Sequence, residues 1–336
     1  MAATQFDIAV GSLTAKSNDD QSKWYLTSLS TDLGIGGVGH GTLHVASQGA
    51  ALPKIGDEVT IKVDATQIFA GHVLGFDTTE NEIVVHAADG LAKLAKLEVQ
   101  GVYENKTAGA ITKEILQKAG LQPGTVEDGP KFSQYILRRG PRAMRHIEDL
   151  AARAGFSLFA DPRGKIHFAA PKTESADHTL EFAVHVLQAQ LRAEAPAFDS
   201  VVVWGEGAGE KGDDKKHWLT TKLSGLTGKA AIDDKLAVKA NQEGKYPCTV
   251  HDGTVSTSAD AKAQAKARMT LLASRLLHGF IETLGNAKVE PGQAIKIDKI
   301  PDKHPLHALV ADKVLHVRRV QQAFSARRGF VTRMEF

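Results

Sequence analysis

Residues 132–168 decide the fold of the middle of the chain, and they read FSQYILRRGPRAMRHIEDLAARAGFSLFADPRGKIHF. The short apolar run Gln134–Leu137 predicts a strand, which Gly140 and Pro141 end. Proline fits the first position of a helix, where its missing N–H is not needed, so we expect a helix to begin at Pro141. Gly155 predicts its end in a left-handed cap. One helix face is apolar at three- and four-residue spacing, through Met144, Ile147, Leu150 and Ala154.

A hairpin follows the helix directly. Phe156–Ala160 and Lys165–Phe168 are typical of strands, and Asp161–Gly164 joins them. The joining tetrad has Asp first, Pro second and Gly last, as a type I turn prefers. This strand, helix and hairpin leave no gap for a catalytic loop, and we expect a rigid module.

Composition places the chain among ordinary globular proteins. Its 336 residues suffice for two or three domains, with 42% hydrophobic and 24% charged residues. The net charge of +2 gives no overall field that would recruit nucleic acid or anionic lipid. The single cysteine, Cys248, excludes an intramolecular disulfide framework and a multi-cysteine zinc site.

The sequence also suggests where the protein is made. Its opening, MAATQFDIAV, lacks a basic segment followed by a long apolar core, so we expect no signal peptide. No run approaches about 18 apolar residues, so we expect no membrane insertion by this chain. Synthesis in a bacterial cytoplasm follows as the expectation.

The pattern of short strands and turns predicts an α+β, mainly β fold. We expect a small β-barrel or sandwich over residues 1–95, an α+β insert over 96–172 and a second β region over 173–336. The second β region includes a mobile, glycine- and charge-rich loop at 205–216 and one long C-terminal helix at 259–278.

Several element boundaries follow from capping and periodicity. Thr107 is expected to cap a helix over 108–119, and Ser258 to cap the helix at 259–278, which Gly279 ends. Residues 180–191 and 309–320 each read as one strand. The remaining strand expectations are 6–10, 25–29, 41–45, 58–63, 67–74, 82–87, 200–204, 280–284, 294–297 and 329–336.

Two turns in the two β regions resemble each other. Pro53–Ile61 and Pro291–Ile297 both place aliphatic residues at the third and fifth positions after a glycine, and a second strand follows each. One interpretation is a generic turn before a strand. The other is a pair of related β domains on either side of the insert.

No motif for catalysis or metal binding stands above background. Residues 34–39 (GIGGVG) match a dinucleotide fingerprint, but the following HGTLHV is typical of a strand, so a β–β connection is favoured. His304 and His307 lack an acidic third ligand, and the proline between them prevents a shared helix face. Cys248 and His251 lack an orienting third group, and a packed cysteine is favoured. We therefore expect no enzyme, no cofactor and no metal.

Two basic clusters remain: Arg138, Arg139, Arg142 and Arg145, and then Arg318, Arg319, Arg327 and Arg328. Their plain interpretation is a solvated face or salt bridges across a subunit contact. Contact with phosphates is the alternative, although interleaved aromatics and a groove-reading helix are missing. We assign Arg138, Arg139, Arg142, Arg145, Arg318 and Arg319 to a subunit or lumen interface.

Short motifs along nearly the whole chain resemble the phage late control protein D family. Val59–Val63, Ile68–Val73 and Val84–Leu91 resemble its opening barrel, with its [IV]-F-x-G-x-V strand and A-x-D-x-L exit. The other matching segments are Asn105–Thr107 with Ile111, Ile115 and Leu116, then Ala119–Leu121, Gln134–Tyr135, Leu150–Phe156, Asp161–Phe168, Ala261–Arg268, Gly285 and Pro291–Gly292.

The resemblance implies a baseplate hub of a contractile tail or a related injection system, akin to the N-terminal half of the type VI secretion spike protein VgrG. Such hubs are trimers that adapt a six-fold tail tube to a three-fold spike in a virion tail or an injection-system particle. Each chain of such a hub supplies two tube-like antiparallel β-barrels, so the resemblance implies one barrel at residues 1–95 and a second at 173–336, which flank the α+β insert. The implied partners are two further copies, a tail tube or tube initiator protein, a trimeric spike protein and baseplate wedge proteins, with no specific nucleic acid. Because the chain ends at Phe336, we expect the spike to be a separate polypeptide. The alternatives are a cell-wall-degrading tail enzyme and a basic, DNA-contacting tail component.

Overall fold

The computed structural model describes residues 4–17, 24–47, 51–172, 174–205, 226–232 and 246–336. The loop predicted at 205–216 lies, from residue 206 on, outside the described residues. None of the helices within the described ranges is long and apolar enough to cross a membrane.

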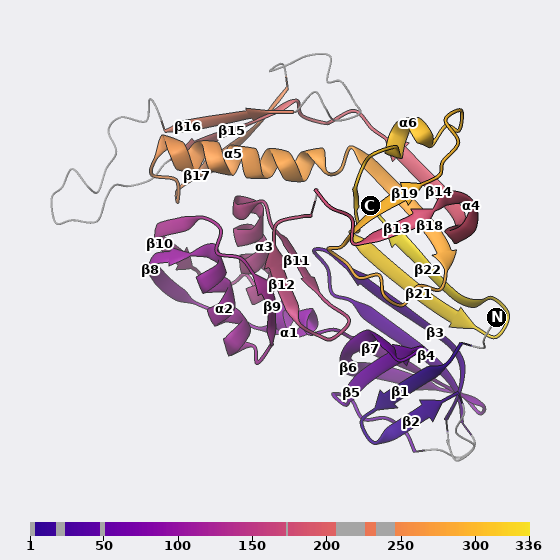
Figure 1. The fold of residues 1–336 in the computed structure, drawn as a ribbon. Helices are drawn as coiled ribbons and strands as arrows, with labels where there is room; N and C mark the ends of the chain where they lie inside the picture. The colour runs from indigo at the N-terminus through magenta and orange to yellow at the C-terminus, as the bar shows by residue number, and fades with distance from the viewer. Residues whose placement is uncertain (1–3, 18–23, 48–50, 173, 206–225, 233–245) are drawn as a thin grey trace.

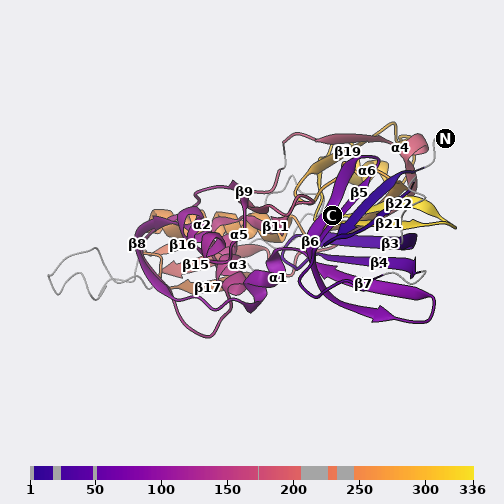
Figure 2. The ribbon, with the colours of Figure 1, turned by 90° about the horizontal axis from the view of Figure 1, so that it is seen from below.

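One 11-stranded sheet runs through both ends of the chain, in the order β14-β18-β22-β21-β3-β4-β7-β6-β5-β1-β2. The early and late strands meet at the antiparallel pair of β3 and β21, whose register sets Gly34 opposite Arg319. We call this pair the seam. Figure 1 shows the early and late strands side by side, and Figure 2 shows them from below. The strands of this sheet are β1 (Phe6–Val10), β2 (Leu13–Lys16), β3 (Trp24–Gly34), β4 (His40–Ser47), β5 (Glu58–Val63), β6 (Thr66–Thr78), β7 (Glu82–Ala88), β14 (Val186–Ala193), β18 (Leu277–Leu284), β21 (Arg319–Ser325) and β22 (Gly329–Glu335).

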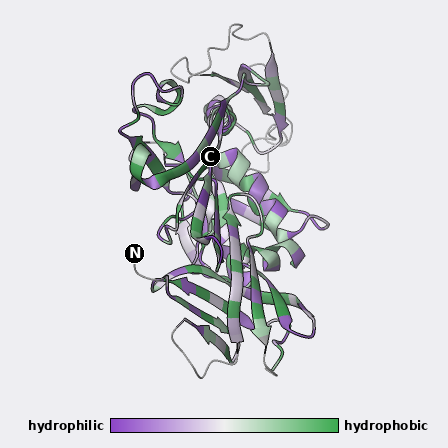
Figure 3. Cartoon of the chain, turned by 90° about the vertical axis from the view of Figure 1, so that its right-hand side faces the viewer, coloured by the Kyte–Doolittle hydropathy of each residue, from purple (hydrophilic) through white to green (hydrophobic). Residues whose placement is uncertain are grey.

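The N-terminal half of this sheet curls around its own core. Its strands alternate inward apolar and outward polar side chains, as a sheet with one buried face requires, and the stripes are visible in Figure 3. Strand β2, at the edge of the sheet, also contacts β3. The largest fully buried side chains include Trp24, Phe69 and Ile61, and Phe330 of β22 joins them across the seam.

The C-terminal half packs a second, smaller sheet against β14, β18, β21 and β22. This sheet has the order β13-β19-β20, formed by β13 (His178–Glu181), β19 (Ala294–Asp298) and β20 (Leu315–His316). Short helices α4 (Phe182–His185) and α6 (His307–Val310) flank it. Ile281, Ile295, Val317 and Met334 are fully buried between the layers.

The two similar turns of the sequence form the same hydrogen bonds. Gly56 and Gly292 both adopt positive φ, at 91° and 81°. The Gly56 N–H donates to Val73 O at 2.9 Å, and the Gly292 N–H donates to Val317 O at 2.9 Å. Each valine N–H then donates back to the residue after the glycine, Asp57 O at 2.9 Å or Gln293 O at 2.8 Å. This reciprocal pairing favours two related β units over a generic turn.

The insert has a hydrophobic core of its own. Helices α1 (Leu91–Lys96), α2 (Ala108–Lys118) and α3 (Ala143–Ala154) pack on a ribbon of β8 (Gly101–Thr107) with β10 (Lys131–Leu137), and on a sheet in the order β11-β12-β9. That sheet consists of β9 (Pro123–Val126), β11 (Ser157–Ala160) and β12 (Ile166–Ala169). Thr107 caps α2 by accepting from Ala110 N at 3.1 Å, as predicted.

A fourth core lies between the long helix α5 (Ser258–Ala273) and a three-stranded sheet. The sheet has the order β16-β15-β17, formed by β15 (Ser200–Gly205), β16 (Thr227–Ala231) and β17 (Pro247–Asp252). Ala261, Ala265, Met269 and Leu276 of the predicted apolar face are buried there. In Figure 1, α5 lies between this sheet and the insert, and it contacts both β15 and α3.

Several predicted elements were wrong in extent. Helix α3 begins at Ala143 rather than Pro141, because the extended Arg142 occupies the N-cap position. Helix α5 is capped by Thr257 rather than Ser258 and ends at Ala273, since residues from Leu277 on pair with β14 and Gly279 lies inside β18. Residues 180–191 form the end of β13, then α4 and most of β14. Residues 309–320 form the end of α6, a turn, β20 and the start of β21.

The predicted fold class is confirmed: the chain is mainly β, with large antiparallel sheets and few helices. Strands from both predicted barrels belong to the same 11-stranded sheet. The predicted domain boundaries at 95/96 and 172/173 stay a prediction, and buried apolar residues form four clusters.

Close packing in the middle of β6 gives a first test. A Cβ added at Gly71 would lie 2.2 Å from the carbonyl oxygen of Ala88, whereas one at Gly75 of the same strand would meet no atom within 4 Å. We expect Gly71→Ala to lower the free energy of unfolding by about 1–3 kcal/mol and Gly75→Ala to leave it almost unchanged. Urea denaturation followed by tryptophan fluorescence measures both, and equal effects would contradict the packing.

Candidate functional site

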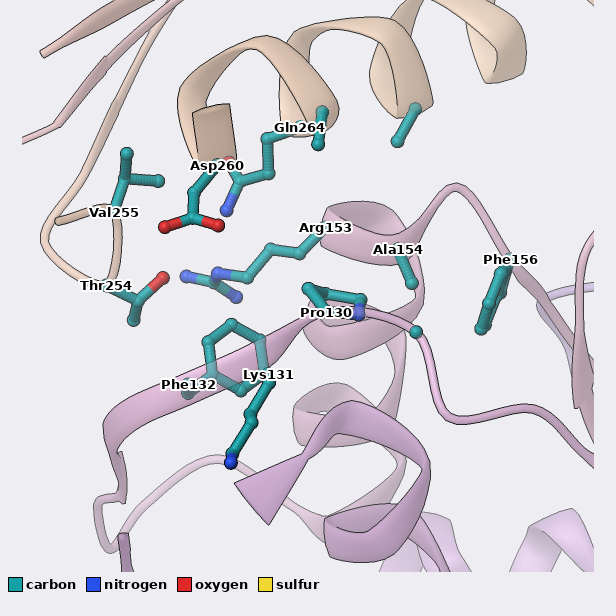
Figure 4. A pocket seen from close by; sticks show the side chains of 13 residues that line it. Pro130, Lys131, Phe132, Arg153, Ala154, Phe156, Thr254, Val255, Asp260 and Gln264 are labelled. Atoms are coloured by element: carbon teal, nitrogen blue, oxygen red, sulfur yellow. The ribbon is translucent and has the colours of Figure 1, made fainter. Parts of the chain in front are cut away.

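The insert meets helix α5 at a buried ion pair. Arg153, in the last turn of α3, donates from Nε to Asp252 Oδ2 at 2.7 Å, and the Asp252 side chain at the end of β17 is only 2% exposed. Asp252 also accepts from Thr254 Oγ1 at 2.7 Å and from Gln264 Nε2 at 3.0 Å. Figure 4 shows Arg153 reaching across from α3 toward Thr254 and the start of α5. One carboxylate thus joins three elements.

The electrostatics of this junction favour the ionised pair. Burial alone would raise the pKa of Asp252, but the Arg153 guanidinium and hydrogen bonds from Thr254 and Gln264 outweigh burial and lower it. Burial, and then repulsion from Arg153, lower the pKa of the neighbouring Arg268. This arrangement suits a fixed structural contact between α3 and α5.

A cavity of about 250 Å³ opens beside the ion pair, in the view of Figure 4. Phe132, Phe156 and Val255 supply apolar walls, and Asp260 and Gln264 supply polar ones. Asp260 accepts from Thr257 Oγ1 at 2.6 Å in the helix cap, and Arg153 is bound to Asp252. The carboxylate of Asp260 and the guanidinium of Arg153 are therefore engaged in local contacts, and no catalytic pair of nucleophile and base forms among the described residues that line the cavity.

The predicted hairpin turn forms a second junction. Asp161 O accepts from Gly164 N at 2.9 Å, which confirms the turn. The Asp161 carboxylate accepts from Arg163 and His167, and Arg163 also donates to Glu290 of the C-terminal half at 2.8 Å. Gln67 of β6 donates to Pro162 O at 2.9 Å. The hairpin tip therefore links the insert to both halves of the large sheet.

Asp161 is the charged centre of that junction. Burial raises its pKa, but hydrogen bonds from His167 and the Lys165 N–H, with the charge of Arg163, outweigh burial and lower the pKa to about 2. His167 stacks on Phe159 with ring centroids 4.9 Å apart, which holds the imidazole beside the carboxylate.

The glycine-rich segment 34–39 connects β3 to β4 in an antiparallel pair, which confirms the β–β interpretation. Ile35 N donates to Arg318 O and Gly36 N to Leu158 O, both at 2.8 Å, so this turn also contacts the insert and the C-terminal half. Gly39 N donates to Asp89 Oδ2 at 2.8 Å. Burial, which outweighs that bond and another from Leu91 N, raises the pKa of Asp89 to about 7.

The six predicted interface arginines lie in different environments. Arg138 and Arg139 are exposed, and Arg139 donates to Gln100 at 2.7 Å. The others pair locally or lie at a cavity: Arg142 with Glu98, Arg145 with Glu148 and Asp149, Arg319 with Asp32 and Glu335, and Arg318 in a cavity that Arg145 also lines. No local sequence pattern indicates that Arg145 and Arg318 come together.

The remaining candidates occupy structural positions. Cys248 packs partly buried against the core under α5, as the packed-cysteine interpretation predicts, while His251 lies on the opposite face of β17. His304 packs its ring against Phe182 at 4.8 Å and accepts from Leu306 N. Within the described part of the chain, no group of three His, Cys, Asp or Glu side chains is placed to hold a metal.

Sequence reasoning missed the junction residues. Neither Arg153 nor Asp252 stands out in the sequence. Their pairing spans 99 residues of chain, and no local pattern reports such a contact. Asp161 was noted only as a turn residue, because its links to Arg163 and through it to Glu290 depend on how the insert docks.

Comparisons with known proteins point to phage tails. The family model of YQBQ-like proteins matches residues 35–149. A 43 kDa tail protein of prophage MuSo2 from Shewanella oneidensis is 13% identical with a TM-score of 0.70, over 98% of this chain and 97% of that one. A tail protein from Neisseria meningitidis MC58 is 12% identical with a TM-score of 0.73, over 99% and 96%.

A third structure extends the likeness to secretion systems. The Escherichia coli c3393 protein, described as a component of the type VI secretion system that resembles the bacteriophage T4 tail proteins gp27 and gp5, is 12% identical with a TM-score of 0.58, over 98% of this chain and 75% of that one. A comparison with curated proteins gives no match. The chain thus has the fold of phage tail and injection-system proteins, and the matches do not single out the late control protein D family.

The buried ion pair gives a second test, with a control on the same helix. Arg153→Met leaves the Asp252 carboxylate buried without its guanidinium, so we expect the free energy of unfolding to fall by about 3 kcal/mol. Arg145→Met removes only surface pairs from a side chain that is 68% exposed, and we expect a change within about 0.5 kcal/mol. Chemical denaturation of both variants measures these changes. If Arg153→Met left the free energy of unfolding unchanged, the junction would be ruled out as a stabilising contact.

The low pKa of Asp161 predicts acid sensitivity. Because its folded pKa of about 2 lies below the ordinary value of 3.8, the carboxylate stabilises the native state above pH 4 and loses this contribution as pH falls toward 2. We expect the free energy of unfolding of the wild type to fall over this range about 2 kcal/mol more than that of Asp161→Asn. The exposed Asp302→Asn variant is the control, and parallel pH profiles for wild type and Asp161→Asn would refute the assignment.

Proposed function

We propose that the chain is a structural baseplate hub, a trimeric ring that adapts a six-fold tail tube to a three-fold spike in a contractile tail or a related injection system. The fold, which spans nearly the whole chain and nearly the whole of two phage tail proteins, supports this proposal. The sequence motifs that resemble the late control protein D family support it at the finer level.

The repeated turn is the observation that carries the proposal. The reciprocal hydrogen bonds of Gly56 with Val73 and of Gly292 with Val317 support two related β units in one chain. Three such chains in a closed ring present six related units, which matches a six-fold partner on one side while keeping three-fold symmetry on the other. This duplication has no evident use in a single-site enzyme.

The proposal assigns this chain a mechanical task without catalysis. Load between a tube and a spike passes through backbone pairing and buried junctions. In this chain the seam of β3 and β21, the Arg153–Asp252 pair and the Asp161 hairpin supply such contacts. The partners are two further copies, a tube or tube initiator protein, a spike protein and baseplate wedge proteins.

The six predicted interface arginines are proposed to lie at a subunit contact or on the ring lumen. Arg138 and Arg139 project from the loop before α3, with Arg142 and Arg145 following on the helix. Arg318 and Arg319 follow β20 near the seam. Guanidinium groups that are exposed, such as those of Arg138 and Arg139, suit pairing with acidic groups of a neighbouring chain.

Particle association tests the hub. Lysate from the native source is separated by gradient sedimentation, the chain is followed by antibody, and the fast fraction is imaged. We expect co-sedimentation with rod-shaped particles at about three copies each, as a C3 ring requires. A chain found only in the slow fraction, beside intact rods that lack it, would overturn the hub and favour a tail-associated enzyme.

A further inference from the structure

A second cavity, of about 410 Å³, lies where the insert meets the C-terminal half. Its walls come from α3, the turn between β3 and β4, β11, the segment that follows α5, and the connection from β20 to β21. The chemically significant side chains that line it are Arg145, Glu148, Ser157, Arg275, His316 and Arg318.

The charges around this cavity are strongly unequal. Three guanidinium groups face one carboxylate, that of Glu148. Arg145 is partly neutralised, with Glu148 at 3.7 Å and Asp149 at 3.5 Å. For Arg275 and Arg318, no carboxylate of the described chain lies within ion-pair distance. Burial and the charge of Arg275 both lower the pKa of Arg318.

The backbone holds Arg318 in this unfavourable position. Its N–H donates to Glu335 O at 2.8 Å, and its carbonyl accepts from Ile35 N at 2.8 Å. Arg318 therefore cannot move its backbone away from Arg275 without breaking the contact between the β3–β4 turn and the C-terminal half. A fixed cluster of like charges with little internal compensation is typical of a site that binds an anion.

His316 is a further poorly compensated group at this cavity. Both ring nitrogens are buried, and neither has a hydrogen-bond partner among the described residues. A buried polar group without a partner costs about 1–3 kcal/mol. An anion with several acceptor oxygens in the cavity would neutralise the arginines together, and its charge would stabilise the protonated imidazole.

We propose that this cavity binds a tetrahedral oxyanion of the sulfate or phosphate class. Donors reach it from α3, from the segment after α5 and from the connection of β20 to β21, which suits acceptor oxygens that point in several directions better than a planar carboxylate approached from one side. Among the side chains that line the cavity, the three arginines exceed the one carboxylate by two positive charges, which matches the charge of a dianion. The cavity is larger than one such anion, so water shares it.

The proposal has a pH signature that a nonspecific ion effect lacks. Burial and the charge of Arg318 lower the pKa of His316 to about 4. The charged groups that face it are Arg145 and Glu148 from α3, Arg275 after α5, and Arg318 beside it. A bound dianion stabilises the imidazolium, so binding raises the pKa of His316 and tightens as pH falls from 7 toward 4.

Isothermal titration of the purified full chain with sulfate, at ionic strength held constant with chloride, tests the site. Sulfate stays a dianion over this pH range, so a change in affinity reports on the protein. We expect saturable binding that weakens about 10-fold or more in Arg275→Gln. Arg328→Gln, at an exposed arginine outside the cavity, is expected to bind as the wild type does.

NMR titration of the His316 imidazole is the second readout, and it needs no substitution. We expect its pKa to rise when sulfate is added and not when chloride is added. Absent binding, equal affinity in wild type and Arg275→Gln, or an unchanged pKa of His316 would each overturn the proposal. Because these measurements use the isolated chain, their failure leaves the hub proposal standing, and failure of the hub leaves the anion site standing.

Discussion

The antiparallel pairing of β3 with β21 is the constraint on which the rest of the structure depends. It brings residues 28–34 against 319–325 and joins the two halves into one sheet. Asp32 reinforces it by accepting from Arg319 Nε at 2.6 Å and from Gln321 Nε2 at 3.1 Å. Because nearly the whole chain lies between these strands, the contact is costly in loop entropy and must be supported by the cores on both sides. Phe330, from the C-terminal half, provides such support inside the N-terminal core.

The insert is held to the rest of the chain at several separate places. The β3–β4 turn donates to Leu158 of the insert, and Gln67 of β6 donates to Pro162 at the hairpin tip. Arg163 at the same tip pairs with Glu290, and Arg153 pairs α3 with Asp252 at the end of β17. Several separate contacts restrict rotation of the insert more than one contact would.

Local physics made much of this fold predictable from sequence. The strands at 6–10 and 58–63 and the cap at Thr107 follow from alternation and side-chain capping within a few residues. The predictions failed where distant pairing overrides local preference: residues 277–278 fit a helical pattern, yet β14 recruits them into a strand. The same limit explains the sites, since Arg145 and Arg318 meet only after the insert has docked on the C-terminal half.

The treatment of buried charge separates the junctions from the basic cavity. Asp252 and Asp161 each accept several hydrogen bonds and lie beside an arginine, so their ionised forms are stabilised within the chain. Such pairs contribute less to stability than to a unique geometry, because each partner is strongly disfavoured without the other. Arg318 and His316 are held just as firmly by the backbone but lack such compensation. A ligand from outside the chain, as proposed for this cavity, would supply the compensation that Asp252 and Asp161 find within it.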